Sequence, residues 1–229
     1  MKNKYRHELK YLVDERDLLL LNNKLTGIMD ADSHYQDGSY EIRSAYFDDY
    51  KDTALKQNLI GVSPRFKYRI RIYNGDNSFI QLEKKLKSHD MTHKESCSLS
   101  YNECLQLLNG NYSISPEDCE FLKQFKVFAA MHLLKPKVIV IYERKAFICP
   151  NGNVRITFDR NISSSTEMED FFKQDISKRP IMESGKHVLE VKYDEFLPKY
   201  IKKTLNTGKM DRTTFSKYYL CRKYMINVR

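Results

Sequence analysis

The stretch "RFKYRIRIY" at residues 65–73 carries two different kinds of side chain at alternate positions. One set is cationic throughout and the other is apolar or aromatic: Arg65, Lys67, Arg69 and Arg71 against Phe66, Tyr68, Ile70 and Ile72. A β-strand directs successive side chains to opposite faces of a sheet. The stretch therefore predicts a strand with one apolar face and one face of four cations with no acid between them.

The bulk composition is that of a globular protein with a polyanionic partner. The chain has 229 residues, of which 41% are hydrophobic and 30% charged, and a net charge of +9. Such a charge favours binding of nucleic acid, anionic membrane or phosphorylated molecules. The five scattered cysteines lack C-x-x-C spacing and predict reduced thiols without a structural zinc. No apolar run is long enough for a signal core or a membrane span, so we expect a cytoplasmic protein.

Alternation recurs along the chain and predicts seven further strands, at residues 5–13, 40–48, 79–87, 91–99, 137–148, 153–159 and 187–194. Helical patterns lie between them, at residues 14–25, 100–108, 115–131, 198–208 and 211–225. Residues 161–186 show no clear period and are expected to form a long, partly helical excursion. No repeat or domain boundary is apparent. We therefore expect one α+β domain over residues 1–229 with an antiparallel sheet.

The direction of the charged strand faces is the central question. Antiparallel sheets usually turn a polar face to water. Here, however, the polar faces are rich in arginine with isolated glutamates, and several amphipathic helices need an apolar surface to cover. A closed sheet with its apolar face outward would satisfy both features. Like charges on neighbouring strands, about 5 Å apart at an effective dielectric near 20, repel by about 3 kcal/mol. Such an interior is unfavourable when empty and favourable when filled by phosphates, which arginine binds through paired hydrogen bonds.

Eight motifs in order resemble the VTC domain of polyphosphate polymerases, a family of the triphosphate tunnel metalloenzymes. They are "YRHELKYLV", "EIRSAYFD", "RFKYRIRIY", "IQLEKKLK", "IYERKAF", "VRITFD", "HVLEVKYD" and "FSKYYL", and the resemblance covers residues 3–225. It implies a closed antiparallel barrel of eight strands with a polar interior and helices around it. It also implies transfer of the terminal phosphate of ATP to a growing polyphosphate chain, with Mn²⁺ or Mg²⁺ as cofactor.

The resemblance also implies roles for individual residues. Phosphate contacts are implied for Lys10, Arg43, Arg69, Arg71, Lys85, Lys94, Tyr142, Arg144, Arg155, Lys192, Ser216 and Lys217. Glu190 is implied as the metal ligand, and Lys10, Arg71 and Glu190 as the residues closest to the chemistry. Glu8 and Glu83 are expected mainly to pair with cations, and Asp159 is expected to be a turn or cap residue at a strand end.

One position departs from the pattern of the wider superfamily. The first strand often contains E-x-E-x-K, whereas here Arg6 replaces the first glutamate. The loss of a carboxylate argues against a triphosphatase, but this alternative and a non-catalytic polyphosphate-binding module both stay open. A nucleic-acid partner is not expected, because no exposed aromatic motif of the RNA-recognition type is present. No SPX-like domain precedes the motifs and no membrane helices follow them, so export is expected to need a separate membrane-protein partner at the inner face of the membrane.

Overall fold

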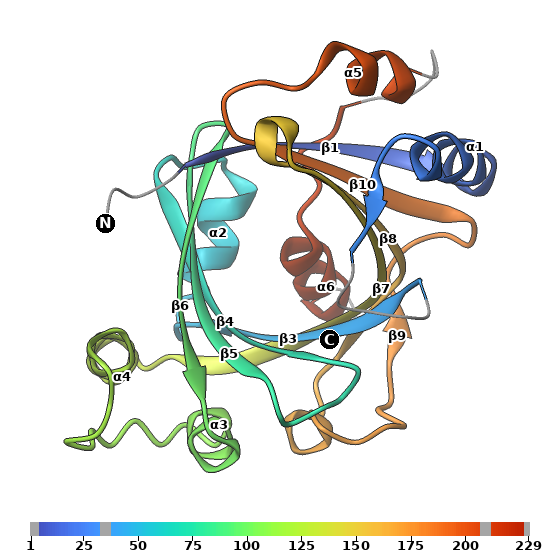
Figure 1. Ribbon diagram of the computed structural model, residues 1–229. Coiled ribbons are helices and arrows are strands. Elements are labelled where there is room, and N and C mark those ends of the chain that lie inside the picture. The colour runs from blue at the N-terminus through green and yellow to red at the C-terminus, as the bar shows by residue number, and fades with distance from the viewer. Residues whose placement is uncertain (1–4, 33–37, 207–211, 227–229) are drawn as a thin grey trace.

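Eight antiparallel strands close into a barrel. The computed structural model describes residues 5–32, 38–206 and 212–226. Around the barrel the strand order is β1, β6, β5, β4, β3, β7, β8, β10 and back to β1, and the β7–β8 pairing closes the ring. Figure 1 views this ring end-on. The α+β class and the closed eight-stranded barrel expected from the sequence are confirmed.

The bounds of the barrel strands agree closely with the alternating segments of the sequence. The strands are β1 (Arg6–Asp14), β3 (Tyr40–Asp48), β4 (Arg65–Tyr73), β5 (Ile80–Ser88), β6 (Met91–Leu99), β7 (Lys135–Cys149), β8 (Val154–Ser165) and β10 (Lys186–Tyr193). Two short strands, β2 (Asp30–Ala31) and β9 (Arg179–Pro180), extend the sheet beside β7 and β8. The β7–β8 turn requires glycine at Gly152, because φ is 74° and a Cβ atom there would lie 2.5 Å from the carbonyl oxygen of Phe196.

Six helices surround the barrel among the described residues: α1 (Glu15–Thr26), α2 (Thr53–Leu59), α3 (Tyr101–Leu108), α4 (Glu120–Met131), α5 (Lys199–Leu205) and α6 (Lys217–Ile226). Local capping explains where the first two expected helices begin. Asp14 accepts the backbone N–H of Asp17 at the start of α1, and Ser100 forms a capping box with Glu103 at the start of α3. In the described part of the chain, no helix has the length and apolar character that a membrane span requires.

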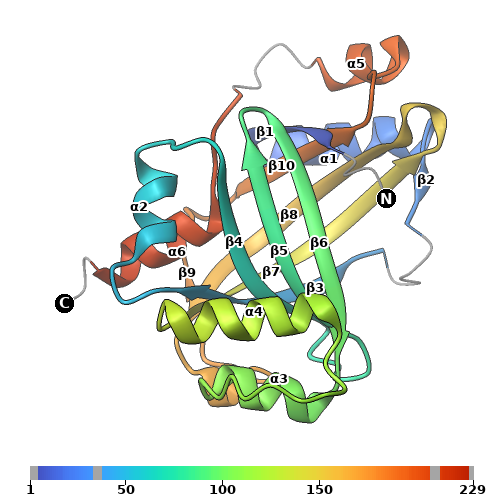
Figure 2. The same cartoon turned by 90° about the vertical axis from the view of Figure 1, so that its left-hand side faces the viewer.

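The apolar faces of the strands point outward and the helices cover them. Ile70, Leu82 and Ile139 pack beneath α3 and α4, which cross the outer face of the barrel in Figure 2. Leu189 and Val191 of β10 pack beneath α1 and α5. These two clusters place the hydrophobic core between barrel and helices, so the polar faces are left to line the interior.

Helix α6 is different, because it packs against residues on the inner side of the barrel. Its Tyr218 and Cys221 are buried with Val138 and Val140 of β7. Tyr218 also donates a hydrogen bond to Asp48 at 2.5 Å, and the same carboxylate accepts the backbone N–H groups of residues 54 and 55 in α2. Helices α2 and α6 are thereby tied together at one end of the barrel.

Several expectations about the segments between strands were wrong. The helix expected at residues 115–131 begins only at Glu120, because the Asp118 carboxylate accepts the Ser115 N–H and pairs with Lys126, which holds the preceding residues in a turn. Strand β8 continues to Ser165, into the stretch expected to be an irregular excursion. The short helix α2 was not expected. The helix expected at residues 211–225 begins only at Lys217, because residues 212–216 are not helical, and the helix expected at 198–208 ends at Leu205. Residues 207, 208 and 211 of these two expectations lie outside the described residues.

The aromatic packing beneath α4 generates a test of the fold. Phe125 is fully buried, with its ring centroid 4.9 Å from that of Tyr68 and 5.3 Å from that of Phe47. Phe125→Ala should lower the free energy of unfolding by about 3–5 kcal/mol, since it removes a large core side chain and leaves a cavity. Urea denaturation measures the change. The control is Val127→Ala on the same helix, where the side chain is 44% exposed and the expected change is within about 0.5 kcal/mol. Equal stability of both variants would contradict the assigned core.

Candidate functional site: a cationic tunnel

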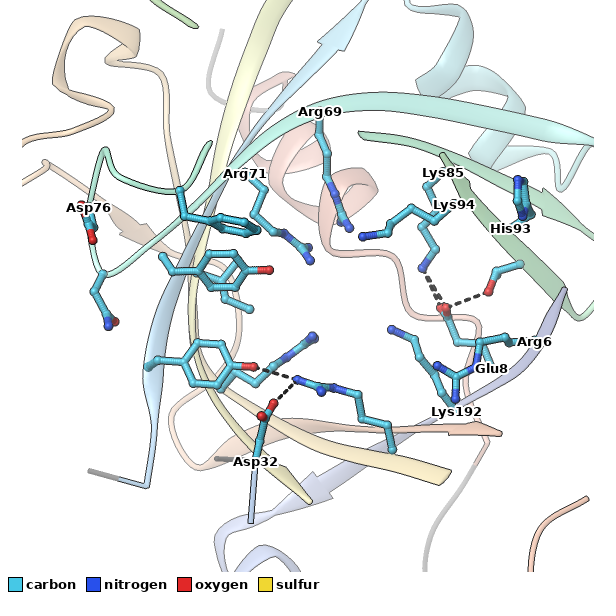
Figure 3. A pocket seen from close by; sticks show the side chains of 18 of the residues that line it. Arg6, Glu8, Asp32, Arg69, Arg71, Asp76, Lys85, His93, Lys94 and Lys192 are labelled. Atoms are coloured by element: carbon cyan, nitrogen blue, oxygen red, sulfur yellow. Dashed lines mark hydrogen bonds and ion pairs between the residues drawn. The ribbon is translucent and has the colours of Figure 1, made fainter. Parts of the chain in front are cut away.

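Two contiguous cavities run through the interior of the barrel. The wide chamber has a volume of about 820 Å³ and the narrow chamber about 100 Å³. They share the side chains of Glu8, Arg69, Arg71, Lys85, Arg144 and Lys192. We call the two chambers together the tunnel. In Figure 3, Arg69 and Arg71 point into the wide chamber from one wall, and Lys85, Lys94 and Lys192 approach from others.

The structure places every residue for which the resemblance implied a site role, except Arg43, on the tunnel lining. The wide chamber includes Arg69, Arg71, Lys85, Lys94, Arg144, Arg155 and Lys192. The narrow chamber adds Lys10, Tyr142, Glu190, Ser216 and Lys217. These side chains come from seven strands and from the start of α6, and alternation within the strands explains why they converge.

Glu83 of β5 holds the most cationic part of the wall together. Its carboxylate lies 2.6 Å from the Arg69 guanidinium, 3.0 Å from Lys94 Nζ and 4.0 Å from Arg71. Burial opposes ionisation of Glu83, but the three cations outweigh burial and hold its pKa well below the ordinary value. Arg69 also donates to the Tyr46 hydroxyl at 2.8 Å. The expectation that Glu83 pairs with cations agrees with these contacts.

A second charge cluster joins β1 and β10. Glu8 lies 2.8 Å from Lys85 Nζ and 2.9 Å from Lys10 Nζ, and Glu190 lies 2.6 Å from Lys192 Nζ. Arg144 approaches Glu190 at 3.7 Å. Burial opposes the charge of Glu190, but Lys192, Lys10 and Lys85 outweigh it and hold the pKa of Glu190 well below its usual range. Both acids are therefore ionised and bound to cations in the tunnel wall.

Asp159 is a wall residue, and the expectation that it is a turn or cap residue was wrong. It lies inside β8, fully buried, and accepts two hydrogen bonds from the Arg144 guanidinium at 2.6 and 2.8 Å. Lys217 Nζ lies 2.5 Å from Oδ2 of the same carboxylate, the oxygen that also accepts the 2.8 Å bond, and 4.8 Å from the Tyr142 ring centre. Asp159 thus positions Arg144 and connects the barrel wall to α6. The motif "VRITFD" contained the signal, because Asp159 shares the parity of Arg155.

The lysines deep in the tunnel lose part of their tendency to be charged. Burial lowers the pKa of Lys85 to about 8, with Lys10 and Lys192 adding repulsion that Glu8 only partly offsets. Burial and the neighbouring Lys10 and Lys85 also lower the pKa of Lys67 well below its ordinary value. Lys67 donates to the Asn58 side chain at 3.0 Å and to the Ser216 hydroxyl at 3.4 Å. A bound polyanion would reverse this effect by favouring the ammonium forms.

Arg43 lies outside the tunnel, which corrects the role implied by the resemblance. On β3 the inward positions are those of Ser44 and Tyr46, which oppose Arg71 and Arg69 in the register with β4. Arg43 therefore points to the outer face, where it is buried and paired with Glu41. Its guanidinium donates to the backbone carbonyls of residues 171, 173 and 174. Arg43 therefore holds the segment of residues 171–174 against the outer face of the barrel.

The opening of the wide chamber contains residues that the sequence did not single out. Asp32 accepts a hydrogen bond from Arg155 at 2.6 Å, and the Tyr40 hydroxyl accepts a second at 3.1 Å. The aromatic residues Tyr73 and Phe79 also line this opening. No motif pointed to Asp32, which lies in a connecting segment beside β2. Phe79 was expected as the first residue of a strand over residues 79–87, but β5 begins at Ile80 and Phe79 lies at the end of the preceding turn.

The residues present fit a divalent metal ion that is shared with substrate phosphates. Among the described residues, no three His, Cys, Asp or Glu side chains gather closely enough to hold a metal by themselves. Glu190 nevertheless faces the tunnel, and across the β10–β8 register lies Thr157, whose buried hydroxyl has no hydrogen-bond partner among the described residues. Mg²⁺ is commonly held by one or two carboxylates together with phosphate oxygens. Glu190, with Glu8 on the adjacent strand, would supply such ligands.

The lowered pKa of Lys85 predicts proton uptake on ligand binding. At pH 8 about half of the Lys85 side chains are neutral in the empty tunnel, and tripolyphosphate should draw about half a proton onto this residue. Affinity should weaken as pH rises through 8, because Lys85 then loses its charge before binding. Titration calorimetry in buffers with different ionisation heats measures the uptake. Lys85→Arg is the control, since arginine stays charged.

The difference between the wild type and Lys85→Arg cancels any proton that the ligand or another lysine exchanges. The variant should take up fewer protons at pH 8 and should bind with less dependence on pH. The same proton count in both proteins would show that Lys85 is already charged in the empty tunnel, against the assigned shift.

The outward position of Arg43 can be tested by separating stability from binding. Arg43→Gln should lower the free energy of unfolding by about 2–3 kcal/mol, because three backbone carbonyls lose a buried charged donor. The affinity for tripolyphosphate should stay within about twofold of the wild-type value. Urea denaturation and titration calorimetry on the same preparation provide both numbers. A tenfold loss of tripolyphosphate affinity at unchanged stability would show instead that Arg43 contacts the ligand.

Comparison with solved structures identifies the fold. A candidate adenylate cyclase from Bacillus halodurans is 15% identical, with a TM-score of 0.54, and the match covers 89% of this chain and 87% of that one. A candidate adenylyl cyclase from Hippeastrum, whose dominant activity is that of a triphosphatase, is 12% identical, with a TM-score of 0.55 and 96% of both chains covered. At these identities the likeness shows a shared triphosphate tunnel fold. No curated protein sequence matches the chain significantly.

The family is shown by the sequence itself. The model of the VTC domain matches residues 5–226, which include all eight barrel strands and all six helices of the described part of the chain. The match thus extends over nearly the full length, and the chain belongs to the VTC domain family.

Proposed function

We propose that this protein is a polyphosphate polymerase that transfers the terminal phosphate of ATP to a growing polyphosphate chain inside the tunnel. Membership of the VTC domain family and the cationic lining support the proposal. Phosphoryl transfer needs alignment of the reacting groups and stabilisation of charge more than covalent chemistry by the protein. The tunnel wall offers both, because its arginines and lysines are held in place by buried acids.

The arginines of the wall are the groups that would hold the β- and γ-phosphates. Arg69, Arg71, Arg144 and Arg155 all line the wide chamber. Arg69 and Arg144 are each fixed by a carboxylate at 2.6 Å, so their guanidinium groups need little reorganisation when a phosphate arrives. Planar guanidinium groups can bind two phosphate oxygens at once. This arrangement favours in-line attack on a γ-phosphate whose oxygens are already neutralised.

The acceptor chain would lie on the other side of the reacting phosphate. Lys10, Ser216 and Lys217 line the narrow chamber, and Lys10 would face the terminal phosphate of the acceptor. One of its oxygens attacks the γ-phosphorus of ATP, the bond from this phosphorus to the bridging oxygen breaks, and that electron pair leaves with ADP. The polyphosphate chain is then longer by one phosphate and moves towards the narrow end.

Glu190 would hold the divalent metal ion, either Mn²⁺ or Mg²⁺. When bound, such an ion neutralises charge on the phosphate oxygens during transfer. Lys192 and Arg144 hold the Glu190 carboxylate in the ionised form that a metal ligand requires. Loss of Glu190 should therefore impair the chemical step more than it impairs the binding of phosphate.

One observation carries the choice of a polymerase over a triphosphatase. Four buried acids of the wall each lie within 3 Å of a cation, and the pKa of each is held below its ordinary value: Glu8, Glu83, Asp159 and Glu190. Such carboxylates are weak bases, whereas a water nucleophile calls for a base with a pKa nearer neutrality. The end of a polyphosphate chain is already ionised and needs no base.

A triphosphatase is the second candidate, because the Hippeastrum protein that shares the fold has a dominant triphosphatase activity. Arg6 stands where the superfamily often has its first glutamate, and here it pairs with Asp194 at 2.8 Å. This exchange removes a carboxylate from the wall of the wide chamber and favours transfer over hydrolysis. Cytoplasmic ATP would be the phosphate donor, and export of the product would need a separate membrane protein.

Incubation of the purified protein with ATP and Mn²⁺ tests the proposal. The wild type should produce long chains on a polyacrylamide gel. Glu190→Ala should bind ATP but lower product formation by about 100-fold, because it removes the metal ligand. Arg71→Ala should weaken ATP binding by about 10- to 100-fold, as expected for loss of a charged hydrogen-bond donor.

Arg179→Ala is the matched control, since Arg179 is exposed on β9 and lines neither chamber. It should leave both binding and synthesis at wild-type levels. Release of inorganic phosphate without chains would support the triphosphatase instead. Tight binding of polyphosphate with no turnover at any metal concentration would identify a binding module.

A further inference from the structure

We infer that an aromatic wall at the opening of the wide chamber, formed by Tyr40, Tyr73 and Phe79, stacks against the base of the bound nucleotide. The wide chamber is then the entrance for ATP, and the narrow chamber holds the polyphosphate chain. The inference rests on the proposed function in one respect, namely that the tunnel takes a nucleoside triphosphate. It adds a subsite for the base and a direction for the substrate.

The three rings form a continuous surface. The ring centroids of Tyr40 and Tyr73 are 5.9 Å apart, and those of Tyr73 and Phe79 are also 5.9 Å apart. All three residues line the wide chamber, together with the apolar side chain of Ile42. Phe79 is 53% exposed, which is a large exposed fraction for a phenylalanine beside a buried charge cluster. An apolar ring surface of this kind offers a nucleobase a face on which to stack.

The order of side chains along β4 matches the order of groups in a nucleoside triphosphate. Arg69, Arg71 and Tyr73 are successive inward residues of this strand, and all three line the wide chamber. Inward residues are spaced by about 6.6 Å, so the ring of Tyr73 lies one step beyond the phosphate-binding guanidinium of Arg71. Phe79 continues the surface outward across the β4–β5 hairpin. A triphosphate held by the arginines would thus direct its nucleoside towards the rings.

The hairpin that carries Phe79 is held in one conformation by its own hydrogen bonds. Asn74 and Gly75 have φ angles of 51° and 68°, which form the turn. The Asn74 side chain accepts the backbone N–H of Glu41 at 2.8 Å, and Asp76 accepts both the N–H and the hydroxyl of Ser78. Phe79 follows directly, so the backbone that carries its ring is ordered before a ligand binds. An ordered hairpin lowers the entropic cost of stacking.

Volume and charge both favour the wide chamber as the one that takes the nucleoside. The wide chamber, at about 820 Å³, has the volume of ordinary small-molecule sites, whereas the narrow chamber at about 100 Å³ does not. The rim of the wide chamber also carries Asp32 and Asp76. Asp32 is paired with Arg155, so Asp76 is the rim acid that would repel a long polyphosphate chain but not a nucleoside, which is uncharged. The narrow chamber has no acid besides Glu8 and Glu190, both of which are paired with lysines.

The experiment compares two ligands that differ by the nucleoside. Phe79→Ala should weaken ATP binding by about tenfold, the loss expected for one base–aromatic stack, and should leave tripolyphosphate binding within about twofold of wild type. Phe79→Tyr keeps the aromatic ring and should bind ATP with the wild-type affinity. Tyr50→Ala is the matched control, because Tyr50 is 66% exposed and lines neither chamber, so it should change neither affinity. Titration calorimetry without added metal measures all four proteins.

The outcomes separate this inference from the proposed polymerase. Selective loss of ATP affinity in Phe79→Ala supports the base subsite, whether or not the protein synthesises polyphosphate. Equal loss of both ligands, or no loss of either, overturns it, even if synthesis by the wild type is demonstrated. Circular dichroism of Phe79→Ala should match the wild type, since the side chain is half exposed, so a change in affinity will not reflect unfolding.

Discussion

The ion pairs of Glu83 are the interaction on which the tunnel depends, because they allow three cations to share one wall. Without the carboxylate, Arg69 and Arg71 of β4 and Lys94 of β6 would flank β5 with no compensating charge, and any pair of them about 5 Å apart would repel by about 3 kcal/mol. Glu8 and Asp159 repeat the arrangement on β1 and β8. Removing one acid leaves buried charges without compensation, which costs more than a surface pair ever contributes. The acids therefore serve the stability of the barrel as well as the site.

The unequal ends of the tunnel follow from where α6 packs. Most helices lie on the apolar outer face, but Tyr218 and Cys221 of α6 pack on inward residues of β7, and residues 214–218 line the narrow chamber. The helix thereby fills one end of the barrel and brings Lys217 to Asp159. The other end has no such helix among the described residues, and an aromatic wall borders its opening instead. The packing of α6 at one end therefore makes the two ends of the tunnel different.

Strict alternation of side chains made the barrel strands and most residues of the tunnel lining predictable from the sequence. Where alternation is interrupted, individual residues were assigned to the wrong place. In β4 every inward residue from 65 to 71 is cationic, so the two faces could be assigned from the sequence. In β3 the inward set includes Ile42 and Ser44, and Arg43 lies on the other parity, so the cation pointed outward. Its partners are carbonyls more than a hundred residues away, which no local pattern encodes. The position of Phe79 was missed because alternation was extended one residue too far, since Phe79 was expected to begin a strand that starts at Ile80.

The excess of cations over acids in the lining bears on the proposed substrate, because it would favour a polymer of phosphates over a single small anion. Lysines and arginines outnumber acids in both chambers, and the imbalance is greater in the narrow one. There the lowered pKa of Lys67 shows that the wall sheds charge when nothing compensates it. One phosphate could neutralise only its nearest neighbours, whereas a chain places a negative charge beside every cation along the wall. Each phosphate of a bound chain would then meet further cations, so the driving force for retaining such a chain would increase with the length inside the tunnel.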